Sequence, residues 1–239
     1  MARTVEAVLA FAAEGNGRAV HLCNAYTLAL ARKDPAFAGA VNRGDLNLPD
    51  GTPLVWVGRR LGLPMEHRVY GPDLMLAVCE AGRAGGVRHY LYGSSPDTVA
   101  CLGHQLEQRF PGVLICGVES PPFRALTPAE ERDLIERVRG SAAQVVWVGL
   151  GTPRQDEFVD RFRDRLGATL VAVGAAFDFN AGVKRQAPRL LRDHGLEWAF
   201  RLATEPSRLW RRYLIGNASF VMGALRGGAT VVPRRTGDA

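Results

Sequence analysis

The chain has 239 residues, of which 47% are hydrophobic and 23% charged, and its formal net charge is +6. A chain of this length can bury a large core, so we expect one domain with an appendage. Residues 168–177 form the longest uninterrupted apolar run, well short of the roughly 20 residues of a spanning helix, and Glu6 interrupts the N-terminal apolar stretch, so we expect neither a membrane span nor a signal peptide.

Short apolar runs alternate with helix-length segments along the body of the chain. The strand-like runs are, in order, RAVHLCNA, DLNLP, RHYLYG, VLICGV, QVVWVGL and TLVAVGAAF. The helix-like segments are YTLALARKD, PLVWVGRRLG, SPDTVACLGHQLEQRF, TPAEERDLIERVRG and TPRQDEFVDRFRDRL. In the fourth of these, Thr127 and Glu130 have the spacing of a capping box. Strands this short and apolar are buried on both faces. The sequence therefore predicts a doubly wound, Rossmann-like α/β fold with a mainly parallel sheet.

The sequence offers no pattern typical of a metal site. The cysteines lack CxxC spacing and mostly lie in apolar runs, which favours reduced core residues over zinc ligands; they are Cys23, Cys79, Cys101 and Cys116. A DxD pair, which would hold a divalent ion against a nucleotide diphosphate, is also missing at the expected strand ends. We therefore expect no bound metal and no cofactor.

Ligands of doubly wound folds bind where strands end and helices begin. The candidate residues at these junctions are Asn24, Asp50, Gly51, Gly93, Ser94, Gly149, Gly151 and Gln155. Glycines and exposed N–H groups at helix starts suit a phosphate or a nucleotide. However, GLGTPRQ is not GxGxxG and GSSPDT is not a P-loop, so neither a dinucleotide nor ATP hydrolysis is indicated. Each glycine turn taken alone is also compatible with a purely structural role.

Asp50, in the segment LNLPDGTPLVWVGRRLG, has two possible roles. An Asp-Gly pair is typical of a hairpin, but the segment that follows has helical length and ends at a glycine. Asp50 then either caps that helix or faces the ligand crevice, where its carboxylate can take a proton.

The C-terminal part of the chain is basic. Residues 184–239 carry 11 Lys+Arg against 4 Asp+Glu, whereas residues 1–183 carry 19 against 20. Arg201, Arg208, Arg211 and Arg212 have helical spacing, and aromatic and leucine side chains lie between them. We expect a basic amphipathic helical appendage at residues 195–228 and a disordered end at 229–239, after a domain formed by residues 1–194. The partner of this appendage is an anionic membrane, a phosphorylated ligand or nucleic acid. Alternatively, the appendage packs as a solvated helix on the domain.

Seven segments carry a resemblance that runs from about Val20 to about Phe220. They are NAYTLALARKDPAF, RGDLNLPDGTPLVW, RVYGPDLM, YLYGSSPDTV, VVWVGLGTPRQDEF, GAAFDFNAGVKRQAP and GLEWAFRLATEPSRLWRRYLIGN. With these segments the chain resembles the WecG/TagA/CpsF family of bacterial glycosyltransferases.

The resemblance implies a reaction and a location. Such enzymes move a hexose or N-acetylhexosamine-type sugar from a UDP-sugar to a polyprenyl-diphosphate-linked acceptor, peripherally, on the cytoplasmic face of the cell membrane. Inversion needs a general base for the acceptor hydroxyl, and the resemblance gives that role to Asp50. It leaves open whether the protein forms a homo-oligomer.

The resemblance also implies roles for other residues, each with an alternative. Arg68 is expected to stabilise leaving diphosphate charge, although it is equally a surface cation. Gln155 is expected to bind the sugar or the base. Asn24 is an active-site residue or a helix cap. Asp178, after the last strand, contacts ribose or uracil or bonds backbone N–H groups. The diphosphate is also expected to meet Arg208, Arg211 and Arg212.

Two positions depart from the family pattern. Leu22 stands where the family usually has a threonine, so a hydroxyl beside the active site is missing; Asp156, after Gln155, replaces the usual glutamate more conservatively. The first departure favours an alternative, a UDP-sugar-binding protein with lost or altered transfer. Nucleic-acid binding through the basic tail is the least supported function, because no binding motif accompanies the charge.

Overall fold

The computed structural model describes residues 1–193 and 195–207. Its centre is a six-stranded sheet with the order β2-β1-β6-β5-β3-β4, in which every neighbouring pair is parallel. The strands are β1 (Arg18–Cys23), β2 (Leu46–Pro49), β3 (Arg88–Gly93), β4 (Leu114–Glu119), β5 (Val145–Gly149) and β6 (Thr169–Ala172). The predicted doubly wound α/β fold is confirmed, and all carboxyl ends of the strands meet at one edge of the sheet.

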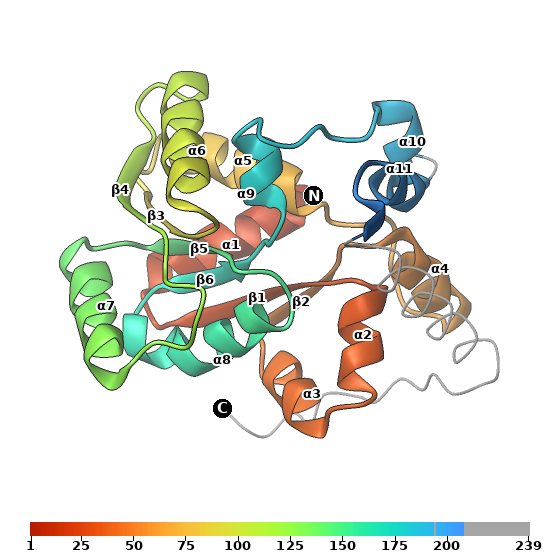
Figure 1. The fold of residues 1–239 in the computed structure, drawn as a ribbon, viewed down its shortest axis with the longest axis horizontal. Helices are drawn as coiled ribbons and strands as arrows, with labels where there is room; N and C mark the ends of the chain where they lie inside the picture. The colour runs from red at the N-terminus through yellow and green to blue at the C-terminus, as the bar shows by residue number, and fades with distance from the viewer. Residues whose placement is uncertain (194, 208–239) are drawn as a thin grey trace.

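Helices cover both faces of the sheet because the side chains of its central strands are apolar on both sides. Val145 and Trp147 of β5 point into one core, and Val146 and Val148 point into the other. The first core is covered by α1 (Ala2–Glu14), α5 (Gly71–Gly82), α6 (Pro96–Arg109) and α9 (Ala176–Asn180). The second is covered by α7 (Pro128–Gly140) and α8 (Arg154–Leu166), with α3 (Pro35–Asn42) packed beside α8. The result is a three-layer sandwich (Figure 1).

The remaining helices lie beyond the carboxyl ends of β1 and β2, at the right of Figure 1. They are α2 (Ala25–Ala31), α4 (Thr52–Arg60), α10 (Arg189–Asp193) and α11 (Glu197–Thr204). Gly195, just before α11, packs against α4: a Cβ placed on it would lie 3.0 Å from the Thr52 side chain. The start of the expected appendage is thus in contact with the body of the domain.

The predicted capping box and the reduced cysteines are confirmed. The Thr127 and Glu130 side chains form both hydrogen bonds of the capping box at the start of α7. The four cysteines are free thiols, and burial raises the pKa of Cys23 and of Cys79 to about 12, as expected for inert core thiols. No helix within residues 1–193 and 195–207 combines the length and the apolar character that crossing a bilayer demands.

The last predicted strand is shorter than the sequence suggests. The apolar run TLVAVGAAF suggested one strand, but β6 ends at Ala172 and α9 begins at Ala176. Gly174 makes the turn between them with φ +52°, a left-handed conformation that favours glycine. As a consequence, Asp178 lies in the short helix α9, after the last strand as expected.

Candidate active site

Residues from both ends of the chain meet beyond the carboxyl ends of β1, β2 and β6. Two adjoining hollows of about 80 and about 70 Å³ share Asn24, Asp50 and Arg201 in their walls. Gly51 and Arg68 line the first hollow, and Gly151 and Gln155 line the second. We call the two hollows together the Asp50 crevice. Five other candidate site residues are therefore brought together around the carboxylate of Asp50.

Asp50 does not cap the helix that follows it. Gly51 is the N-cap of α4, and α4 has no side-chain cap hydrogen bond. The Asp50 backbone N–H extends the pairing of β2 by bonding the Cys23 carbonyl at 2.8 Å. Its carboxylate accepts one long hydrogen bond, from the Gly71 N–H at 3.4 Å. Of the two roles considered for Asp50, the helix cap is wrong, and the carboxylate faces the crevice.

The crevice perturbs the acidity of Asp50. Removal from water and the neighbouring carboxylate of Glu197 raise its pKa from the ordinary 3.8 to about 6, against the lowering effects of Arg68, the Gly71 N–H and Arg201. A carboxyl with a pKa near 6 is mostly ionised at neutral pH yet more basic than an exposed aspartate. These are the properties required of a general base.

Arg68 is fixed in the wall of the crevice. One of its guanidinium nitrogens, Nη1, donates to Oε2 of Glu197 at 2.8 Å, and the guanidinium lies over the Tyr70 ring, 4.8 Å from its centroid. The Arg68 side chain is 20% exposed and that of Glu197 is 10% exposed. The alternative that Arg68 is a solvated surface cation is wrong.

Asn24 and Gln155 each make a local hydrogen bond and also face the crevice. The side-chain oxygen Oδ1 of Asn24 caps α2 by accepting from the N–H groups of Tyr26 and Thr27, at 3.0 and 3.2 Å. Gln155 Oε1 accepts from the Gly151 N–H at 3.0 Å. Asn24 thus has the predicted alternative role of helix cap, and in both residues the hydrogen bond described uses the amide oxygen.

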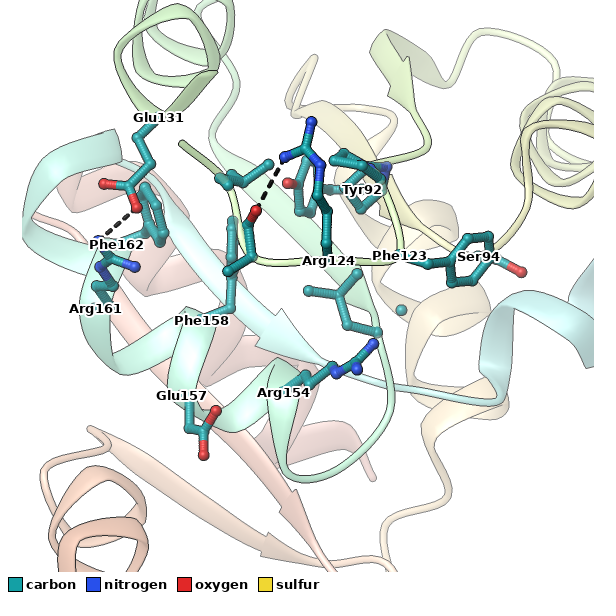
Figure 2. A pocket seen from close by; sticks show the side chains of 16 residues that line it. Tyr92, Ser94, Phe123, Arg124, Glu131, Arg154, Glu157, Phe158, Arg161 and Phe162 are labelled. Atoms are coloured by element: carbon teal, nitrogen blue, oxygen red, sulfur yellow. Dashed lines mark hydrogen bonds and ion pairs between the residues drawn. The ribbon is translucent and has the colours of Figure 1, made fainter. Parts of the chain in front are cut away.

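A second, larger cavity of about 430 Å³ lies beside the ends of β3 and β5. Ser94 and Gly149 line it, and stacked aromatic rings of Tyr92, Phe158 and Phe162 form one wall (Figure 2). Its volume falls within the roughly 300–1,000 Å³ of small-molecule sites. We call it the β3–β5 cavity.

Two of the predicted glycines have a packing explanation. A Cβ on Gly93 would lie 2.6 Å from the backbone of Gly149, and a Cβ on Gly149 would lie 2.6 Å from the Phe177 ring. Gly151 differs, because a Cβ there would meet no atom within 4 Å, although its φ of +76° favours glycine. Gly93 and Gly149 therefore permit close packing of the strand ends, and Gly151 permits the turn before α8.

Asp178 is held between the two sites. It accepts from Ser94 Oγ at 3.3 Å and forms an ion pair of 2.7 Å with Lys184 Nζ, which also lies 3.3 Å from Glu205. Ser94 itself has φ +58°, which is uncommon for a residue other than glycine. The position of Asp178 next to Ser94 agrees with the expectation that both lie at the sheet edge.

Leu22 occupies space that the crevice would otherwise include. It lies in the wall of the smaller hollow, is buried, and its Cδ2 lies 3.1 Å from a Cβ placed on Gly71. At this position the chain thus presents an apolar side chain to the crevice, whereas a threonine would present a polar hydroxyl group.

The sequence did not indicate all residues of the crevice. Glu197 and Tyr70 were not predicted, although both lie in quoted segments, GLEW and RVYGPD. Glu197 occupies the first turn of α11, where acidic residues commonly stabilise a helix, so nothing local distinguished it. Arg201, singled out as part of the basic tail, contributes to the crevice instead. The other three predicted cations, Arg208, Arg211 and Arg212, lie outside the described residues.

No group of three or more His, Cys, Asp or Glu side chains suited to a metal ion occurs in the described part of the chain. The crevice instead places a basic carboxylate beside Arg68 and Arg201. Fold and site together define a doubly wound α/β protein with a crevice around an ionisable carboxylate at the carboxyl edge of its sheet, the position at which such folds bind ligands.

Comparison with known proteins gives the family. The model of the glycosyl transferase WecG/TagA/CpsF family matches residues 1–231, so the chain belongs to this family. A protein of Bacillus spizizenii is 31% identical over 186 residues, which cover 77% of this chain and 70% of that protein. A protein of Staphylococcus aureus is 24% identical over 177 residues, covering 74% and 68%. Both are named N-acetylglucosaminyldiphosphoundecaprenol N-acetyl-beta-D-mannosaminyltransferase.

Proposed function

We propose that this protein is an inverting hexosyltransferase that moves a hexose or N-acetylhexosamine-type sugar from a UDP-sugar to a polyprenyl-diphosphate-linked acceptor in cell-surface glycopolymer synthesis. The observation that carries the proposal is Asp50, a carboxylate in the wall of a crevice, free of any capping role and with a raised pKa. The names of the relatives support a lipid-linked acceptor.

In this mechanism Asp50 takes the proton of the acceptor hydroxyl. The acceptor oxygen then forms its bond to the anomeric carbon on the face opposite the UDP, and the bond from that carbon to the diphosphate oxygen breaks. The electron pair leaves with UDP, whose added charge needs cations. Arg68 and Arg201 lie in the walls of the crevice with Asp50 and are suited to this role.

We place the nucleotide part of the donor in the β3–β5 cavity. Its volume and aromatic wall suit a base, and Ser94 and Asp178 at its edge offer hydrogen bonds to ribose or uracil. Arg154 opens α8 in its wall and forms no ion pair within the described residues, so it can meet a phosphate. Gly151 and Gln155 lie between this cavity and Asp50, where the transferred sugar would lie.

The remaining expectations complete the proposal. Residues 1–194 would form the catalytic domain and 195–228 a basic appendage whose Arg208, Arg211 and Arg212 meet the diphosphate. The protein would work as a peripheral protein on the cytoplasmic face of the membrane. Leu22 supports a second candidate, a UDP-sugar-binding protein without transfer, since the crevice lacks a hydroxyl there.

A donor panel tests the proposal. The full-length protein is incubated with single UDP-sugars and a lipid-diphosphate-linked sugar, and both UDP release and the glycosylated lipid are measured. One donor that yields both products supports transfer. Binding of a UDP-sugar without either product would favour the second candidate, and the absence of both binding and product would contradict the proposed function.

A further inference from the structure

Helix α4 has a buried face and an exposed face. Leu54, Val55 and Gly58 are buried against the domain. Trp56 is 61% exposed, and Leu61, just after the helix, is also exposed. A tryptophan exposed to this extent is unusual for a helix that merely covers a core, so the outer face of α4 requires a separate explanation.

One side of α4 forms a stripe that begins at the crevice, half-buried at Pro53 and exposed at Trp56 and Arg60. Residues three or four apart lie on the same side of a helix, which aligns Pro53, Trp56 and Arg60. We call these three residues the α4 stripe. Pro53 lines the larger hollow of the Asp50 crevice, together with Thr52. The stripe therefore runs outward from the mouth of the crevice.

The start of α11 extends this surface on the other side of the mouth. Gly195 packs against Thr52, which joins the two elements, and α4 and α11 lie at the same end of the molecule (Figure 1). Trp198 lines the crevice and is 41% exposed, and Leu196 is exposed beside it. Trp198 thus lines the crevice directly, and Trp56 lies one helical turn beyond Pro53, which also lines it.

The charge of this surface is positive. Helix α4 contains Arg59 and Arg60 and no acidic residue. Arg60 forms no ion pair within the part of the chain that the structure describes. The acidic residue of α11, Glu197, is buried and paired with Arg68. Unneutralised cations and exposed aromatic rings therefore occur together around the crevice mouth.

We propose that the α4 stripe and the start of α11, with Leu196 and Trp198, dock this protein on an anionic lipid surface and so present the Asp50 crevice to its acceptor. Tryptophan rings favour the headgroup region of a bilayer, and arginines are attracted to anionic lipids. The proposal deepens the proposed function and rests on it, because a lipid-linked acceptor must reach Asp50 from the membrane. It extends membrane contact to α4, in the body of the domain, beyond the appendage that begins at residue 195.

The test uses the full-length protein and the double variant Trp56→Gln with Arg60→Gln. Binding is measured by co-sedimentation with phosphatidylcholine vesicles with and without phosphatidylglycerol. We expect the wild type to bind the anionic vesicles and the double variant to bind them at least about tenfold more weakly. A matched control, Leu114→Gln with Arg139→Gln, removes an exposed leucine and an exposed arginine near the opposite end of the sheet, and it should bind like the wild type.

Transfer is measured in parallel with two acceptors, the polyprenyl-linked one in vesicles and a short-chain water-soluble analogue. The double variant should lose transfer only to the vesicle-bound acceptor. If the double variant binds vesicles as well as the wild type does, the proposed docking surface is wrong. If it does so and light scattering also shows a change in its oligomeric state, the occupant of this surface is a second copy of the chain. If the wild type uses neither acceptor, the proposed function fails, while the vesicle data still decide the docking surface.

Discussion

Replacing Asp50 with asparagine should make the protein both less active and more stable. Asparagine keeps the size of the side chain and an oxygen that can accept from the Gly71 N–H, 3.4 Å away. It removes the negative charge that is held out of water beside the carboxylate of Glu197. A residue kept for catalysis at a cost in stability shows this pair of effects, whereas loss of a structural contact lowers stability.

The size of the stability effect follows from the pKa. The folded protein holds Asp50 at about 6 against an ordinary value of 3.8, and this difference corresponds to roughly 3 kcal/mol. Asp50 lowers the stability of the folded state at high pH, because above about 6 the folded protein must hold the ionised carboxylate in the crevice. Below 3.8 Asp50 is protonated in both the folded and the unfolded state, so no cost in stability remains. Asp50→Asn should therefore stabilise the protein by roughly 2–3 kcal/mol at pH 8 and by less than about 1 kcal/mol at pH 4.

The same pKa predicts the activity profile. Transfer by the wild type should fall as the pH drops through about 6, because the protonated carboxyl cannot accept the proton of the acceptor hydroxyl. Asp50→Asn should lower transfer by about 10² to 10⁴ at every pH, while UDP binding changes little.

The assay combines urea unfolding of both proteins at several pH values with initial rates of UDP release. Thr52→Ser, a conservative change in the same turn, serves as a control that should alter neither quantity strongly. Near-normal turnover by Asp50→Asn would refute the role of base. Equal stability of the two proteins at pH 8 would refute the raised pKa and, with it, the argued environment of the carboxylate.

Three further predictions follow from the site and the core. Glu197 raises the pKa of Asp50 and Arg68 lowers it. Glu197→Gln should therefore move the acid limb of the pH–rate profile below about 6, and Arg68→Gln should move it above about 6. Shifts in the opposite directions would contradict the electrostatic assignment. Transfer should survive EDTA, measured as UDP release with and without added Mg²⁺, and a strict metal requirement would mean that the diphosphate lies elsewhere. His21→Ala should lower the free energy of unfolding, measured with urea, by about 3–5 kcal/mol, because it leaves Asp156, which is fully buried and lies 3.0 Å from His21 Nδ1, without this partner. The control is His104→Ala, at an exposed position. An equally small effect of both substitutions would show that the buried pair contributes little.

Local patterns in the sequence were enough for the class of fold and the position of the site. Apolar runs separated by helix-length segments predicted a parallel sheet, because only strands buried on both faces are apolar throughout. The capping box of Thr127 and Glu130 was readable because both of its hydrogen bonds join residues three apart. Asp50 was identified because it ends a strand, and the carboxyl ends of parallel strands share one edge.

The tertiary structure decided which groups surround that carboxylate. Glu197 and Arg68 form an ion pair although they are separated by 129 positions in the chain, and His21 and Asp156 by 135. The pKa of Asp50 depends on such neighbours and on the exclusion of water, and two of these neighbours, Glu197 and Arg201, come from α11. Likewise, the apolar run at the end of the sheet did not reveal where β6 stops, because the left-handed turn at Gly174 lies inside this run, next to Gln155 of α8. Hydrophobic periodicity indicates which face of a helix or strand is buried, but which element packs against that face is determined only in the folded structure.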